Sequence, residues 1–156
     1  MSIVQFNFPT VIRFGVGAIK ELPQHLKDQG KKRPLLVTDP IVATLPFFLE
    51  IMDDLKAAGL EPSVYCEMHK NPVKSDVMKG KAAYNEASSD CIVGIGGGVG
   101  LDVARSIALA INHHRDLFDY DDLIGGDKYV TEEVPYFVCV PTTSGTGSEV
   151  GRSAII

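Results

Sequence analysis

A run of glycines between an apolar segment and a helical segment is the strongest chemical signal in the sequence. Gly96, Gly97 and Gly98 follow the apolar residues 91–95 and precede residues 101–111, which have helical periodicity. Glycines at such a junction let the backbone approach a ligand closely, and the free amides and dipole of a helix start favour a phosphate. A plain strand-to-helix turn rarely needs three consecutive glycines. The run is neither GxGxxG nor a Walker loop, so it indicates phosphate binding and excludes a P-loop ATPase.

A loop rich in hydroxyls and glycines follows a later apolar segment. Residues 141–149 read PTTSGTGSE and come directly after the apolar residues 136–140. The hydroxyls of Thr142, Thr143 and Thr146 offer donors to a phosphate, a ribose or a carboxamide, whereas a solvent-facing linker of this composition would be unremarkable. Because loops that follow buried strands commonly carry binding residues, we interpret this Thr-rich loop as part of a ligand site.

Two further polar residues are candidates with open alternatives. Asp39 follows the expected strand at residues 35–38, where a carboxylate can accept both ribose hydroxyls of an adenosine and repel a 2′-phosphate. An aspartate before Pro40 is equally typical of a turn or a helix cap. Asn71 stands beside Pro72 and by itself fits an Asx turn.

Histidines and acidic residues show no metal-like spacing. The four histidines are interpreted as surface or capping residues, since none is paired as metal ligands usually are: His25, His69, His113 and His114. The acidic residues 116–122 fit a solvated loop, with a cation site as the alternative.

Composition limits the classes of partner and compartment. The 156 residues carry a net charge of −5 without a long block of one sign, which disfavours duplex nucleic acid because phosphate binding needs a basic face. No apolar run approaches the roughly 20 residues of a membrane-spanning helix, and no signal segment opens the chain. Three cysteines without a CxxC pair are interpreted as reduced core residues. These features predict a cytoplasmic protein.

The elements that must position these residues alternate along the chain. Strands are expected at residues 35–38, 63–66, 91–95 and 136–140, and helices at 19–27, 45–58, 75–87 and 101–111. Short apolar strands separated by helices predict a parallel sheet covered on both faces. Residues 3–14, broken by Pro9, predict two short strands joined by a turn, and this exposed strand pair could join two copies in a homodimer. The predicted fold is therefore α/β, a Rossmann-like parallel sheet preceded by a short β-hairpin.

The glycine run and the Thr-rich loop together resemble the family of iron-containing (group III) alcohol dehydrogenases. That family carries GGGSxxDxAK after a strand and PTTxGTxSE further on, and this chain has GGGVGLDVAR at residues 96–105 and PTTSGTGSE at 141–149. Val99 replaces the usual serine, Arg105 the usual lysine, and Gly151 a common threonine. The resemblance extends over essentially the whole chain.

The resemblance implies an NAD-linked oxidation of small alcohols and the reverse reduction of aldehydes. It assigns Asp39 to the adenosine ribose, which favours NAD over NADP, and it assigns backbone amides of the glycine run to the pyrophosphate. The full set of expected cofactor-binding residues is Asp39, Asn71, Gly97, Gly98, Val99, Asp102, Thr142, Thr143 and Thr146.

The resemblance also places a catalytic Fe²⁺ or Zn²⁺ outside these residues. In the family a second, helical domain supplies one aspartate and three histidines to the metal, and no histidine of this chain matches them. Residues 1–156 are therefore expected to form a dinucleotide-binding domain without metal ligands, inactive alone. Two alternatives stay open: a nucleotide-binding module without catalysis, and a relative of glycerol dehydrogenase or dehydroquinate synthase, which the Thr-rich loop fits less well.

Overall fold

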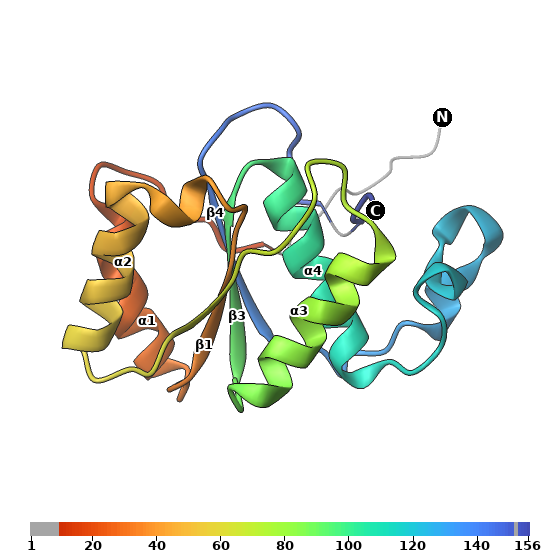
Figure 1. Cartoon of the computed structure of the whole chain (residues 1–156), viewed down its shortest axis with the longest axis horizontal. Coiled ribbons are helices and arrows are strands. Elements are labelled where there is room, and N and C mark those ends of the chain that lie inside the picture. Colours follow the sequence, from red (N-terminus) through yellow and green to blue (C-terminus); the bar gives the residue numbers. More distant parts are fainter. Residues whose placement is uncertain (1–9, 152) are drawn as a thin grey trace, which may run out of the picture.

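Four parallel strands form one sheet in the computed structural model, which describes residues 10–151 and 153–156 (Figure 1). The strands are β1 (Pro34–Val37), β2 (Ser63–Tyr65), β3 (Cys91–Gly96) and β4 (Tyr136–Pro141), in the order β2-β1-β3-β4. All three pairings are parallel. Because β3 pairs with β1 and not with β2, the direction of chain progression reverses between β1 and β3. In open α/β sheets, ligands bind at the carboxyl ends of the strands beside such a reversal.

Helices cover both faces of the sheet, as predicted. The α-helices are α1 (Leu22–Asp28), α2 (Pro46–Ala57), α3 (Lys74–Glu86) and α4 (Gly98–Asn112). Figure 1 shows α1 and α2 on one side of the sheet and α3 and α4 on the other. Short 3-10 helices complete the chain: η1 (Ala18–Glu21), η2 (Val42–Thr44), η3 (Leu117–Tyr120), η4 (Asp122–Ile124) and η5 (Gly126–Tyr129).

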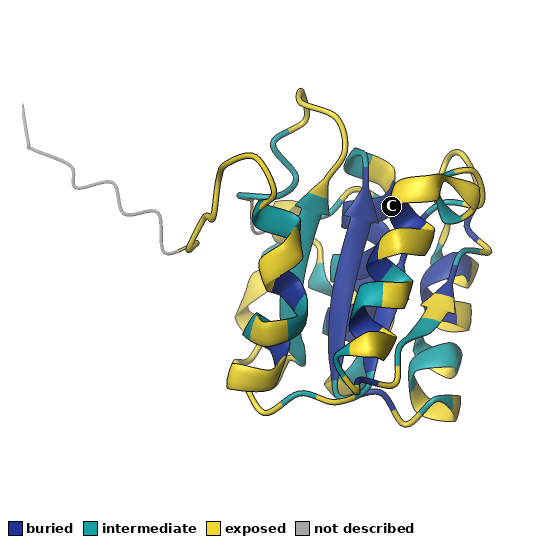
Figure 2. Cartoon of the chain, turned by 90° about the vertical axis from the view of Figure 1, so that its left-hand side faces the viewer, coloured by how far each residue is buried: buried dark blue, intermediate teal, exposed yellow. Residues whose placement is uncertain are grey.

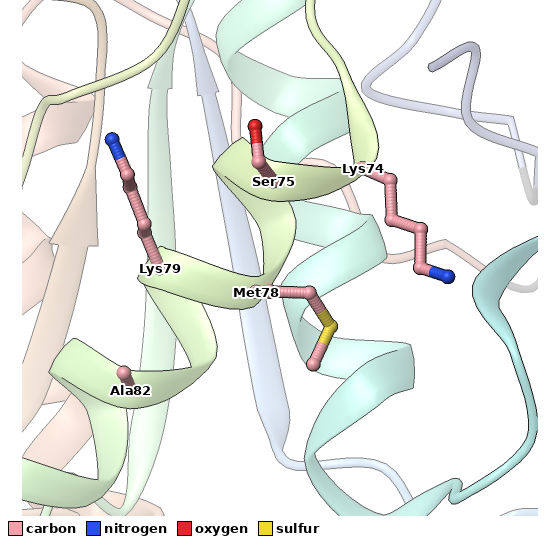
Figure 3. A pocket seen from close by; sticks show the side chains of 5 residues that line it. All are labelled: Lys74, Ser75, Met78, Lys79 and Ala82. Carbon is pink, nitrogen blue, oxygen red and sulfur yellow. The ribbon is translucent and has the colours of Figure 1, made fainter.

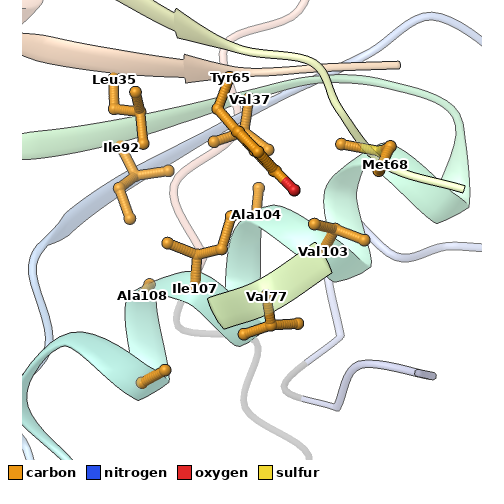
Figure 4. Close-up of a cluster of buried hydrophobic side chains, with 11 residues drawn as sticks. Leu35, Val37, Tyr65, Met68, Val77, Ile92, Val103, Ala104, Ile107 and Ala108 are labelled. Atoms are coloured by element: carbon orange, nitrogen blue, oxygen red, sulfur yellow. The ribbon is translucent and has the colours of Figure 1, made fainter. Parts of the chain in front are cut away.

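The core lies in two layers because successive strand side chains point to opposite faces. Leu35, Val37 and Ile92 pack with side chains of α3 and α4 (Figure 4). Leu36 and Val93 pack with α1 and α2 on the opposite face. Every one of these strand side chains is fully buried. In Figure 2 the buried residues gather in the central strands, while β4, at one edge of the sheet, is half-buried.

A glycine in β3 lets α4 pack close to the sheet. A β-carbon on Gly94 would lie 2.8 Å from the β-carbon of Ala104, closer than such atoms approach one another. The helix predicted from residue 101 in fact begins at Gly98, since the end of the glycine run forms its first turn. The phosphate-binding signal and the helix start are thus the same residues.

The predicted N-terminal β-hairpin lies mostly outside the described residues, which begin at residue 10. Its remaining part, residues 10–14, contains no strand, and the side chains of Val11 and Phe14 are exposed. A strand needs a hydrogen-bonded neighbour, and none is described for these residues. Within the described part of the chain, no helix is long and apolar enough to cross a membrane.

Candidate functional site

The turn from β3 into α4 presents free backbone amides. Gly96 ends β3 with φ 146°, a conformation that side chains with a β-carbon rarely adopt. Gly97 is the N-cap residue of α4, and no side chain caps the helix. The first intrahelical bond is donated by the amide of Leu101 to Gly97, and in an α-helix the preceding N–H groups have no intrahelical partner. The amides of Gly98 and Val99 therefore form, at the carboxyl end of β3, a helix start of the kind that favours an anion.

The Thr-rich loop lies directly against this glycine turn. The backbone N–H of Thr142 donates to the carbonyl oxygen of Gly96 over 2.9 Å. A β-carbon on Gly97 would lie 3.1 Å from the hydroxyl oxygen of Thr143. Thr142, Thr143 and Thr146 are all exposed, so their hydroxyls are accessible beside the free amides. The structure thus brings together six of the nine predicted cofactor residues, namely Gly97, Gly98, Val99, Thr142, Thr143 and Thr146.

Asp39 caps the turn that follows it, and its second carboxylate oxygen points toward the glycine turn. Its Oδ1 accepts hydrogen bonds from the amides of Ile41 and Val42, at 2.9 and 3.0 Å, so it does cap the following turn. Its Oδ2 faces the glycine turn, because a β-carbon on Gly96 would lie 3.8 Å from it. Asp39 and the glycine turn therefore stand on the two sides of the reversal point between β1 and β3. One carboxylate oxygen holds the loop, and the other faces the place where a ligand would lie.

Thr38 borders the candidate site and is not among the residues that the sequence singles out. Its side chain is fully buried, and its hydroxyl oxygen has no hydrogen-bond partner among the described residues. A β-carbon on Gly96 would lie 3.9 Å from that oxygen. A buried hydroxyl without a partner costs free energy, and this one lies beside the glycine turn. The only signal in the sequence was a hydroxyl residue between an apolar run and Asp39.

Asn71 is exposed in the loop between β2 and α3, which leaves the parallel strand β2 at its carboxyl end (the whole sheet is shown in Figure 1). None of the contacts described for the glycine turn involves it. The buried carboxylate of Asp76 holds its loop, accepting from the amides of Val73 and His69 at 3.0 and 3.2 Å and lying 2.8 Å from Nδ1 of His69. Burial alone would raise the pKa of Asp76, but these donors hold that pKa below its ordinary value. The loop of Asn71 is therefore fixed by a buried charge.

Asp102, the remaining predicted residue, is largely buried one turn after Gly98 in α4. Its Oδ1 lies 3.9 Å from Nη1 of Arg105. Asp102 therefore lies on α4 after the glycine turn, next to the guanidinium of Arg105.

Burial raises the pKa of all three cysteine thiols and so disfavours their thiolate form. Burial raises the pKa of the Cys91 thiol to about 12 and that of the Cys139 thiol above its ordinary value. Burial also raises the pKa of Cys66, with the charges of Glu67 and Asp39 adding to the shift. All three are free, and the described chain has no group of three or more His, Cys, Asp or Glu residues able to hold a metal ion.

A shallow depression on α3 is separate from the site. It is lined by Lys74, Ser75, Met78, Lys79 and Ala82 (Figure 3). All five side chains come from one helix, and Lys74 forms an ion pair with Asp116. None of these five residues belongs to the glycine turn or the Thr-rich loop, which meet at the carboxyl end of β3.

Comparison with known proteins agrees with this fold and site. The sequence pattern of the family described as iron-containing alcohol dehydrogenase matches residues 9–156. The chain is 39% identical over 147 residues to 4-hydroxybutyrate dehydrogenase from Cupriavidus necator, covering 94% of this chain and 38% of that protein. It is 30% identical over 154 residues to NAD-dependent methanol dehydrogenase from Bacillus methanolicus, covering 99% and 39%. The crystal structure of a 1,3-propanediol oxidoreductase superimposes with a TM-score of 0.84 at 31% identity, covering 96% and 38%.

The geometry defines the class of the protein: it is an α/β nucleotide-binding fold in which a glycine turn begins α4 without a side-chain cap among the described residues. Within that class, the chain belongs to the iron-containing alcohol dehydrogenase family. It spans about two fifths of the length of the relatives that it matches (38% and 39%).

Proposed function

We propose that this chain is the dinucleotide-binding domain of an NAD-dependent alcohol dehydrogenase. One observation carries the proposal: the uncapped start of α4 and the Thr-rich loop meet at the reversal point of the sheet, with a free oxygen of Asp39 on the other side. The names of two relatives support it, since one is a 4-hydroxybutyrate dehydrogenase and the other an NAD-dependent methanol dehydrogenase.

This arrangement suits the diphosphate of a dinucleotide. The amides of Gly97, Gly98 and Val99 would hold its oxygens, and Gly97 and Gly98 carry no side chain that would push the Thr-rich loop away from these amides. The exposed hydroxyls of the Thr-rich loop would donate to the same phosphates or to the nicotinamide ribose. When bound, NAD would supply the acceptor for the hydride that leaves the alcohol.

Asp39 would select NAD over NADP. Its free Oδ2 would accept from the hydroxyls of the adenosine ribose, and its charge would repel a 2′-phosphate. Because Oδ1 is held by two backbone amides, the carboxylate is fixed in the orientation that this selection needs.

We assign metal binding to none of the described residues of this chain. The family description names iron, but the described residues offer no group of three donors that would fit the ion. We therefore derive no step through a metal. The substrate would be a small alcohol or its aldehyde, in keeping with the names of the relatives.

Calorimetric titration of the chain with NAD and NADP tests the proposal. We expect saturable binding of NAD that is at least about tenfold tighter than binding of NADP, the difference that one fixed repulsive charge can produce. An alcohol oxidation assay with added Fe²⁺ or Zn²⁺ should give no turnover by this chain. Absence of NAD binding would refute the nucleotide site. Turnover would refute the expectation that the metal ligands lie outside this chain.

A further inference from the structure

Arg105 joins α4 to the end of the Thr-rich loop and to the residues just after it. Its Nη1 donates to the carbonyl oxygen of Ser153 over 2.6 Å, and its Nη2 donates to the carbonyl oxygen of Ser148. The two acceptors lie 43 and 48 residues further along the chain than Arg105. A single side chain of the helix therefore holds two backbone positions of a distant loop.

Neighbouring groups fix the direction of this side chain. The guanidinium carbon lies 5.8 Å from the ring centroid of Phe137, and Nη2 lies 3.9 Å from the sulfur of Cys139, both on β4. Asp102 lies 3.9 Å from Nη1 on the helix side. Only 16% of the Arg105 side chain is exposed. A cation this buried is stable only when it is paired and hydrogen-bonded, so its two carbonyl acceptors are part of what keeps it there.

The Thr-rich loop has few other attachments to the glycine turn. At its start, the amide of Thr142 bonds to Gly96. Further along, Thr146 and Ser148 bond mainly to each other, and Gly147 has φ 69°, which lets the backbone change direction there at little cost. Among the hydrogen bonds of the described residues, the far arm of the loop is thus held to α4 through the carbonyl of Ser148, in addition to the packing of Thr146 on Gly98.

We propose that Arg105 is a positioning residue that keeps the Thr-rich loop closed on the glycine turn. The proposal rests on the NAD-binding function above and names the residue that prepares its site. An arginine suits the role because its planar fork reaches two separate acceptors, whereas a lysine ammonium is a single point of charge. Val99 offers no hydroxyl to a phosphate, so the loop hydroxyls that Arg105 holds in place carry more of the binding.

The test compares Arg105→Lys and Arg105→Ala with the control Arg115→Ala. Arg115 stacks on the ring of Tyr129, with 3.8 Å from its guanidinium carbon to the ring centroid, in the segment after α4. Amide hydrogen exchange in the free protein should be faster by about tenfold at residues 142–151 in both Arg105 variants, the effect of losing one hydrogen bond to a charged group. Arg115→Ala should leave that exchange unchanged.

Ligand binding gives the second readout. Arg105→Lys should weaken NAD and NADP by the same factor, about tenfold, because the lost contacts do not involve Asp39. Its thermal unfolding midpoint should stay near that of the wild type, which separates a local role from general destabilisation. If Arg105→Ala does not fold, Arg105→Lys decides the question. Unchanged amide exchange of the loop in Arg105→Lys would overturn the positioning role of Arg105, whether or not the wild type binds NAD. Failure of the wild type to bind NAD would count only against the proposed function.

Discussion

A β-carbon on Gly98 would lie 2.7 Å from the Cγ2 methyl of Thr146 and 2.9 Å from its hydroxyl oxygen. Residue 98 opens α4, and residue 146 lies in the middle of the Thr-rich loop. The two segments therefore meet at a distance that only a glycine permits. This contact links the anion-binding amides to the loop hydroxyls.

Gly98→Ala should push the Thr-rich loop away from the helix start. We expect NAD affinity to fall by about tenfold or more, since the added methyl removes loop donors and enters the space of the phosphate. The fold should persist, because the displaced loop is exposed. Calorimetric titration measures the affinity, and Gly151→Ala is the control, since its β-carbon would lie 3.7 Å from the nearest atom. Equal affinity of the two variants would contradict the expectation.

Asp39→Asn should change cofactor preference. The amide oxygen can still accept from Ile41 and Val42, so the turn should stay capped. Loss of the charge should raise the affinity for NADP relative to NAD by about tenfold. The two dissociation constants are measured by titration, alongside Asp121→Asn, which alters a capping carboxylate on the amide of Leu123. An unchanged ratio in Asp39→Asn would remove Asp39 from the selection of the cofactor.

The buried carboxylate of Asp76 should make the free energy of unfolding depend on pH in the acid range. Its pKa lies below the ordinary 3.8, so the charged form stabilises the fold above that pH. This stabilisation is lost as the pH falls through the lower pKa of the folded state. Asp76→Asn should be less stable than the wild type at pH 7 by about 1–3 kcal/mol, and the difference should shrink below pH 3.8. Urea unfolding at several pH values measures it.

Asp53→Asn is the control for that series, because residue 53 lies exposed on α2. Its difference from the wild type should stay small and nearly constant with pH. A difference for Asp76→Asn that does not shrink in acid would mean that the carboxylate is not charged in the folded state.

Thr38→Val should separate folding from binding. It removes a buried hydroxyl that has no partner among the described residues, so stability should stay equal or rise by about 1 kcal/mol. NAD affinity should fall if that hydroxyl completes the site. Thr44→Val is the contrast, because Thr44 donates its hydroxyl to the carbonyl of Ile41 and should lose stability. Unfolding midpoints and titration together decide, and unchanged NAD affinity would exclude Thr38 from the site.

The layered fold could be predicted because its signals are local. The run Leu35-Leu36-Val37 supplies side chains to both faces of the sheet, and such a continuous apolar run is typical of a buried parallel strand. The glycine run likewise predicted the turn from β3 into α4 from adjacent residues, whereas its binding of a phosphate stays a prediction. The order of the strands could not be predicted, since no residue in β3 specifies that its neighbour is β1 and not β2.

The parts of the site that sequence reasoning missed depend on distant contacts. The sequence marks Arg105 only as a replacement for lysine, because its acceptors lie 43 and 48 residues away. It marks Thr38 only as the end of a strand, and the lack of a hydrogen-bond partner for its hydroxyl among the described residues emerges only when β1 and β3 lie side by side. For Asp39 the sequence allows a cap or a ribose contact; the structure shows the cap, and the ribose contact stays a prediction.

The close packing of Ala104 on Gly94 has a kinetic consequence. It fixes the N-terminal half of α4 to β3, so the free amides at the helix start are held in place, whereas the Thr-rich loop is exposed and held by a few bonds. A nucleotide would therefore dock on a rigid surface first and be retained by the loop afterwards. Changes in the loop should act on how long the nucleotide stays bound, and hardly on how fast it arrives.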